Sequence, residues 1–174
     1  MIKISVCDDD EGQLTFFKQC FMEYNEKHKE KIEANFYQSV QSLLNEKKFS
    51  PDVYFLDIEL QDGNGLKLAG KIRTRNSKIP IVFITSHEEF MPEAFHVHAY
   101  QYLNEKKNAQ AVENVLNQLA DYFSEQNQIF SFQTYGEMIS LDCRDIICFT
   151  SEKRKNIVIA ESGEFEYYGK FSDI

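Results

Sequence analysis

The chain has 174 residues, of which 43% are hydrophobic and 27% are charged. This is the composition of an ordinary globular protein, and it excludes a chain that is disordered throughout. Acidic residues number 28 and lysines plus arginines 19, which gives a formal net charge of −9. Bulk attraction to nucleic acid is therefore excluded, and any contact with DNA has to come from a local basic patch.

The first 123 residues alternate short apolar segments with amphipathic ones. The expected strands are Ile2–Cys7, 32–36, Val53–Leu56, Ile81–Ile84 and 100–103. Apolar residues recur at helical spacing in the segments 11–24, 39–44, 66–72, 88–97 and 111–122. Strands that alternate with helices in this way predict a parallel sheet with helices on both faces.

The first apolar segment, Ile2–Cys7, is too short for a signal peptide or a membrane span, and acidic residues follow it directly. We therefore expect a cytoplasmic protein without a membrane partner. The cysteines show neither CxxC nor zinc-ligand spacing, which favours reduced, buried thiols. They are Cys7, Cys20, Cys143 and Cys148.

The pattern changes after residue 123. Residues 124–128 are polar, and we expect them to link two domains. From residue 129 to residue 174 the chain has short β-rich segments separated by turns, with no helical pattern between them. So few antiparallel residues make a small core, and Ser172 is a helix-capping signal with no helix after it. We expect residues 129–174 to be the first part of a larger β-rich domain.

Polar residues follow three of the expected parallel strands. Asp8 and Asp9 follow the first strand, Asp57 the third and Thr85 the fourth. Such strand ends share one edge of the sheet, where ligands bind. Carboxylates this close need a cation to offset their repulsion, and oxygen ligands suit Mg²⁺. One acid alone would be read as a solvated turn residue, but the combination predicts a Mg²⁺ and phosphoryl site in which a carboxylate is the nucleophile.

Residues 1–123 resemble the receiver domain of two-component response regulators. The resemblance implies a flavodoxin-like α/β fold, with a five-stranded parallel sheet in the order 2-1-3-4-5. The residues that carry it are Asp8-Asp9, Phe55-Leu56-Asp57-Ile58 with the later Gly65, Phe83-Ile84-Thr85-Ser86, and Ala99-Tyr100-Gln101-Tyr102-Leu103.

The same resemblance implies the roles of the site residues. Asp57 would accept a phosphoryl group from a sensor histidine kinase, and Thr85 and Tyr102 would respond together, promoting a homodimer. For Tyr102 a plain packing role is an equal alternative. Such a protein is a phosphoacceptor that assists its own phosphotransfer and dephosphorylation, and not a conventional enzyme. The implied Mg²⁺ ligands are Asp8 through water, Asp9, Asp57 and the backbone carbonyl of Glu59.

One position departs from the receiver pattern. The family ends its fifth strand with a lysine, whereas here Glu105 occupies that position and Lys106 follows it. A carboxylate there would repel Asp57 and the phosphoryl oxygens. We therefore expect Lys106 to point toward Asp57 through a distorted strand end, and Glu105 to face solvent.

The β-rich segment resembles the DNA-binding domain of LytTR-type response regulators, which read DNA with loops between strands. Lys153, Arg154, Lys155 and Asn156 fall in the first such loop, and these residue types suit phosphate and base-edge contacts. A solvated hairpin turn is the alternative. Residues 125–174 hold five lysines or arginines against nine acids, so we expect DNA binding by this chain to be weak.

Two other functions fit parts of the sequence. Residues 6–12 also resemble the start of haloacid-dehalogenase-type Mg²⁺ phosphatases, with Asp8 as the nucleophile and Asp10 as the acid/base, although a matching lysine and a late acidic pair are missing. The third possibility is a receiver that acts only through protein contacts.

Overall fold

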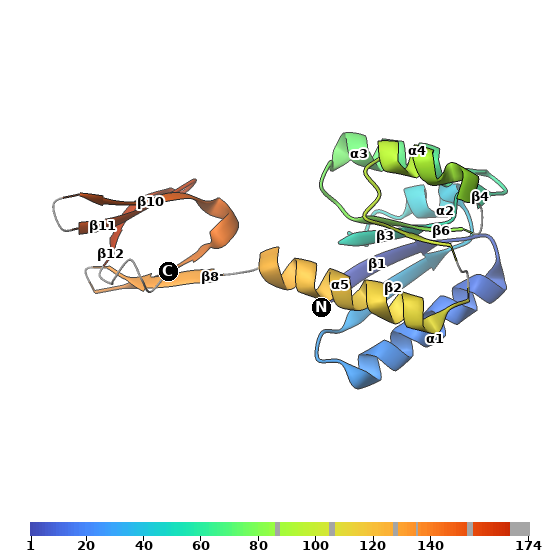
Figure 1. Ribbon diagram of the computed structural model, residues 1–174, viewed down its shortest axis with the longest axis horizontal. Coiled ribbons are helices and arrows are strands. Elements are labelled where there is room, and N and C mark those ends of the chain that lie inside the picture. Colours follow the sequence, from blue (N-terminus) through green and yellow to red (C-terminus); the bar gives the residue numbers. More distant parts are fainter. Residues whose placement is uncertain (86–87, 105–106, 127–128, 135, 153–154, 168–174) are drawn as a thin grey trace. The chain divides into compact units, whose positions relative to one another are not determined.

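The computed structural model divides the chain into two units, residues 1–117 and 118–174, and each is described by itself (Figure 1). The structure describes all residues except 86–87, 105–106, 127–128, 135, 153–154 and 168–174. In the described residues no helix is both long and apolar enough to span a bilayer.

The first unit is built on a five-stranded parallel sheet in the order β2-β1-β3-β6-β7. This order confirms the predicted flavodoxin-like topology. Because the order reverses between β1 and β3, their carboxyl ends lie side by side, with Cys7 level with Leu56. The strands are β1 (Ile2–Cys7), β2 (Ile32–Tyr37), β3 (Val53–Leu56), β6 (Ile81–Ile84) and β7 (Gln101–Leu103).

Helices cover both faces of this sheet (Figure 1). On one face lie α1 (Glu11–Lys27) and the first half of α5 (Ala109–Gln126), and on the other lie α2 (Val40–Asn45), α3 (Gly65–Arg75) and α4 (Met91–His96). The Phe17 and Phe21 rings of α1 pack edge-on against Phe55, each with 5.9 Å between ring centroids. On the opposite face Leu56 and Phe83 belong to a buried cluster with residues of α2 and α3. Burial on both faces explains why β3 and β6 are continuously apolar.

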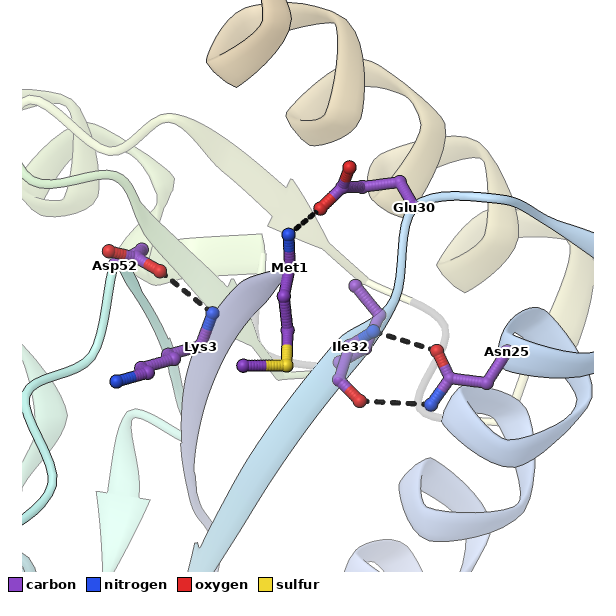
Figure 2. Close-up of polar contacts among 6 residues, drawn as sticks. All are labelled: Met1, Lys3, Asn25, Glu30, Ile32 and Asp52. Carbon is purple, nitrogen blue, oxygen red and sulfur yellow. Dashed lines mark hydrogen bonds and ion pairs between the residues drawn. The ribbon is translucent and has the colours of Figure 1, made fainter. Parts of the chain in front are cut away.

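The amino ends of the strands are held by polar groups that bond the backbone (Figure 2). The Asn25 side chain accepts the Ile32 N–H at 2.7 Å and donates to the Ile32 carbonyl at 2.9 Å. The Asp52 carboxylate accepts the Lys3 N–H at 2.8 Å, and the Met1 amino group pairs with Glu30. These contacts fix where β1 and β2 begin, and so help to set their register.

Three features of the chain differ from the sequence-based expectation. A short hairpin, β4 (Glu59–Leu60) with β5 (Gly63–Asn64), follows β3, and a 3₁₀ turn, η1 (Glu88–Phe90), precedes α4. Helix α5 continues to Gln126, so residues 124–126 are helical. No Gly or Pro interrupts this segment, and Glu and Gln are good helix formers. The division between the units falls inside α5, and the domain limits 1–123 and 129–174 stay a prediction.

After the second half of α5, the second unit is antiparallel and β-rich, as predicted, with a 3₁₀ turn, η2 (Cys143–Asp145), which the sequence did not indicate. Phe132, Val158 and Tyr167 are the buried centre of a small aromatic cluster. One sheet pairs β8 with β9, and the other has the order β10-β11-β12. The strands are β8 (Ile129–Gln133), β9 (Met138–Asp142), β10 (Ile146–Glu152), β11 (Lys155–Ala160) and β12 (Gly163–Tyr167).

The expectation of four buried cysteines is wrong for two of them. Cys7 and Cys20 are buried, but Cys143 and Cys148 are exposed. Cys143 lies in the turn η2, and Cys148 lies on β10, an edge strand of its sheet. Both places let a thiol face solvent, which the spacing of the cysteines could not indicate.

Candidate functional site

Asp8 is the first residue after β1 and is completely buried. Its N–H donates to the Tyr37 carbonyl at 3.1 Å, which extends the β1–β2 pairing one residue beyond the strand. Its Oδ1 accepts the Asp10 N–H at 2.9 Å. The Asp8 carboxylate is therefore held at the carboxyl edge of the sheet by both its own backbone and the next loop.

Asp10 caps the helix that follows. Its Oδ1 accepts the Gly12 N–H at 2.7 Å and the Gln13 N–H at 3.3 Å at the start of α1. A carboxylate at this position satisfies amides that the helix itself leaves without partners. The residue to which the phosphatase alternative assigns acid/base chemistry thus serves as a helix cap in this structure.

Asp57 occupies the equivalent place after β3 and is 2% exposed. Its N–H donates to the Cys7 carbonyl at 2.8 Å, and its Oδ1 accepts the N–H of Ile58 at 2.9 Å. A Cβ added at Gly65 would lie 2.0 Å from the Asp57 carbonyl oxygen. Only glycine therefore permits α3 to begin this close to Asp57.

The three predicted acids converge. Asp8, Asp9 and Asp57 each place a carboxylate oxygen within 4.8 Å of the others. The pKa of the nearby Cys7 thiol is raised from 9.0 to about 12, first by burial and then by the negative charges of neighbouring acids. The acids responsible are Asp62, Asp8, Asp57 and Asp9. A set of close, oxygen-only ligands that includes buried carboxylates fits a hard divalent cation.

An open hollow of about 560 Å³ lies beside the acids. Asp9 and Asp57 line it, together with residues 59–64 of the β4–β5 hairpin, which include Glu59 and Gln61. The Gln61 N–H donates to Asp9 Oδ2 at 3.0 Å. The structure thus brings Glu59, the predicted carbonyl ligand, to the same hollow as Asp9 and Asp57, although no signal in the sequence indicated the hairpin that carries it.

Thr85 and Tyr102 come from the two strands beyond β3. Thr85 follows β6, is completely buried, and donates its N–H to the Leu103 carbonyl at 3.0 Å. The pairing of Leu56 with Phe83 places Thr85 one residue beyond the level of Asp57. Tyr102 pairs with Phe83 in β7, and its half-buried ring packs on the apolar cluster. Both residues therefore belong to the same five-stranded sheet as the strands that Asp8 and Asp57 follow.

Glu105 and Lys106 lie outside the described residues, so the exchange that we expect between them stays a prediction. The next residue, Lys107, is described and exposed. A Cβ added at Gly12 would lie 4.0 Å from Lys107 Nζ. The segment after β7 thus brings a cation near the first turn of α1.

The predicted DNA loop lies between β10 and β11, where Lys153 and Arg154 are also outside the described residues. Lys155 is described, and its Nζ lies 2.9 Å from each carboxylate oxygen of Glu166. Asn156 is half-buried on β11. Lys155 therefore neutralises an acid of its own sheet, although such an exposed pair contributes little to stability and can be exchanged.

Sequence reasoning missed Asp62, Gln61 and Asn64. Asp62 accepts hydrogen bonds from α2, and Asn64 Oδ1 caps α3 through the Leu66 N–H at 2.9 Å. Asn directly before a helix is a capping signal that was available in the sequence. Nothing in the local pattern pointed to Asp62, because its partners lie more than twenty residues away.

Residues 4–117 match the family model described as response regulator receiver domain. An uncharacterized response regulatory protein of Yersinia pestis is 29% identical over 120 residues, which cover 69% of this chain and 49% of that protein. The sensory transduction protein LytR of Staphylococcus haemolyticus is 32% identical over 111 residues, 64% of this chain and 42% of LytR. These matches span less than half of the relatives' length.

The fold also matches solved structures. The response regulator protein TrrA of Thermotoga maritima, solved in complex with Mg(2+)-BeF, aligns with a TM-score of 0.59 and 22% identity. The alignment covers 68% of this chain and 99% of TrrA.

Proposed function

This chain belongs to the response regulator receiver domain family, and from that premise we propose that it accepts a phosphoryl group on Asp57 from a sensor histidine kinase. The observation that carries the proposal is the convergence of three carboxylates within 4.8 Å beside an open hollow. A nucleophilic carboxylate needs both features, because the hollow admits the phosphoryl group and the neighbouring acids recruit a cation.

The residues that would hold Mg²⁺ are Asp8, Asp9 and Asp57, with the backbone carbonyl of Glu59. When bound, the ion would offset the charge of the acids and of the phosphoryl oxygens. The oxygen-only donor set supports this assignment, as does the complex of TrrA, a protein with the same fold, with Mg(2+)-BeF.

The chain's own residues orient the transfer. A carboxylate oxygen of Asp57 forms a bond to phosphorus while the bond from phosphorus to the donor imidazole breaks, and the imidazole nitrogen takes up a proton. The Ile58 N–H on Oδ1 fixes the plane of the carboxylate. We assign the Thr85 hydroxyl to a phosphoryl oxygen, Tyr102 to the accompanying movement of β7, and Lys106 to the phosphoryl charge.

Self-association is the proposed response. On α4, Met91 is 45% and Phe95 82% exposed, so this short helix presents apolar surface. A second copy of the chain would cover it when phosphate shifts the equilibrium between two states of the β6–β7 edge. Phe95→Ser should therefore abolish phosphate-dependent dimerisation in size-exclusion chromatography. Met22→Ser, at an exposed methionine of α1, is the matched control and should leave it intact.

We extend the proposal to transcriptional control through a LytTR-type domain, which the name and similarity of the LytR relative support. Lys153, Arg154, Lys155 and Asn156 at the β10–β11 hairpin would contact DNA. Replacing each of the three cations with alanine should lower the salt dependence of DNA binding by about one phosphate contact. An unchanged slope for all three would favour the receiver that acts only through protein contacts.

The experiment that tests the central proposal is phosphorylation with a small phosphodonor in Mg²⁺, followed by intact mass and peptide mapping. We expect one phosphoryl group, located on Asp57 and absent from Asp57→Asn. A phosphoryl group on Asp8 that persists in Asp57→Asn would instead establish the phosphatase alternative.

A further inference from the structure

We propose that Asp62, which is not among the predicted site residues, is a positioning residue for the acidic site formed by Asp8, Asp9 and Asp57. It fastens the β4–β5 hairpin to α2, and thereby holds Gln61 on Asp9 and Glu59 at the edge of the hollow. The link to Mg²⁺ rests on the proposed function, whereas the link to Gln61 does not.

The first observation is that Asp62 caps a helix from outside it. Its Oδ1 accepts the Val40 N–H and its Oδ2 the Gln41 N–H, each at 2.9 Å. These amides open α2 and have no partner within the helix. The bonds from Gln41 and Val40 lower the pKa of Asp62 from 3.8, as expected for a carboxylate that is bound in its ionised form.

The second observation is that the adjacent residue of the same turn bonds the candidate metal site. The Gln61 N–H donates to Asp9 Oδ2 at 3.0 Å. A Cβ added at Gly63 would lie 2.9 Å from Val40 Cγ2, so the hairpin also packs directly on α2. The turn therefore lies between α2 and Asp9, with two hydrogen bonds to α2 and one to Asp9.

The bonds of Asp62 to α2 and the bond of Gln61 to Asp9 depend on each other, because the same turn makes both. Residues 61 and 62 are consecutive in a tight turn, and the hairpin itself pairs only Glu59 with Asn64 and Leu60 with Gly63. An isolated hairpin of that length is not stable in water. Without the Asp62 cap, the hairpin would be held by buried Leu60 and by the packing of Gly63 on Val40, and neither contact bonds the turn residues Gln61 and Asp62.

The test compares Asp62→Ala with two controls in Mg²⁺ titrations followed by NMR. Asp62→Ala should weaken Mg²⁺ binding about fivefold, the factor that corresponds to losing a helix cap. Asp62→Asn keeps one of the two capping oxygens and loses the charge, so it should weaken Mg²⁺ binding by less, about twofold. Asp52→Ala removes a carboxylate that also bonds a backbone N–H, but at the other edge of the sheet, and should leave Mg²⁺ binding unchanged.

A second readout uses the metal-free protein. Hydrogen exchange of the Gln61 amide should accelerate about fivefold in Asp62→Ala and stay unchanged in Asp52→Ala. Equal Mg²⁺ affinity and equal Gln61 exchange in Asp62→Ala and the wild type would overturn the inference. Failure of the wild type to bind Mg²⁺ would refute the proposed function, while the exchange of Gln61 would still decide the positioning role.

Discussion

The two edges of the five-stranded sheet carry the same kinds of polar side chain and use them differently. At the amino edge, Asn25 and Asp52 each bond a backbone group of a neighbouring strand (Figure 2). At the carboxyl edge, Asp8 and Asp57 are buried and lie within 4.8 Å of each other and of Asp9. At the amino edge each polar side chain forms its own hydrogen bonds, whereas at the carboxyl edge the close negative charges repel one another and lower the free energy of unfolding.

This difference separates stability from function along the same strands. Substitutions at the amino edge should lower the free energy of unfolding without changing the chemistry. Removal of an acid at the carboxyl edge should relieve repulsion and abolish the chemistry. Variants at the two edges can therefore be compared in one protein by the same measurements.

The largest effect is expected from Gly65→Ala. The added Cβ would meet the Asp57 carbonyl oxygen at 2.0 Å, so α3 or the end of β3 has to move. We expect a loss of about 3 kcal/mol in the free energy of unfolding, measured in urea, and no phosphorylation. Gly70→Ala in the same helix has no atom within 4 Å of its Cβ and should gain about 0.5 kcal/mol. If both variants lost stability equally, the close approach at Gly65 would not be the cause.

A smaller loss is expected at the amino edge from Asn25→Ala. Both of its hydrogen bonds to Ile32 disappear, which should cost about 2 kcal/mol. Phosphorylation of the folded protein should proceed at the wild-type rate. Asn114→Ala, on the exposed surface of α5, should change the free energy of unfolding by less than about 0.5 kcal/mol. A slower phosphorylation of Asn25→Ala would show that the two edges are not independent.

Asp57→Asn should do the reverse and stabilise the metal-free protein by about 1 kcal/mol, because it removes one of three converging charges. Asp52→Asn should instead destabilise it by about 0.5 kcal/mol, since it weakens the bond to the Lys3 N–H. Urea unfolding in chelator and in Mg²⁺ measures both. Mg²⁺ should stabilise the wild type and Asp52→Asn more than Asp57→Asn. Destabilisation by Asp57→Asn in chelator would contradict the repulsion argument.

The smallest effect concerns the thiols. The folded state raises the pKa of Cys7 from 9.0 to about 12 and that of Cys20 to about 11, with burial as the main cause at each residue. Both thiols therefore hold their protons more tightly in the folded state. Their contribution to stability is full below pH 9 and declines as the pH rises toward 11 and 12. Maleimide labelling at pH 8, followed by peptide mapping, should modify the exposed Cys143 and Cys148 first, and early labelling of Cys7 would contradict its burial.

Local pattern alone determined the order of the elements, the parallel sheet and the three acids at its carboxyl edge. Alternation of apolar and amphipathic segments is a short-range signal, and a doubly wound sheet has only one edge where such strand ends can meet. The resemblance to receivers added the roles of Asp57, Thr85 and Tyr102. The structure adds the register of β1 and β3, which sets Asp8 level with Asp57, and the burial of both residues.

Only the tertiary structure decided which polar residues serve the fold and which serve the site. Asp8, Asp9 and Asp10 are adjacent in sequence, yet Asp10 caps α1 while the other two face Asp57. Asp62 accepts its hydrogen bonds from α2, which is distant in the sequence. The close approach that requires Gly65 comes from the start of α3 lying against Asp57. The continuation of α5 to Gln126 and the exposure of Cys143 and Cys148 were settled in the same way. Each depends on contacts between distant segments, and a hydrogen bond or a clash between them leaves no periodic trace in the sequence.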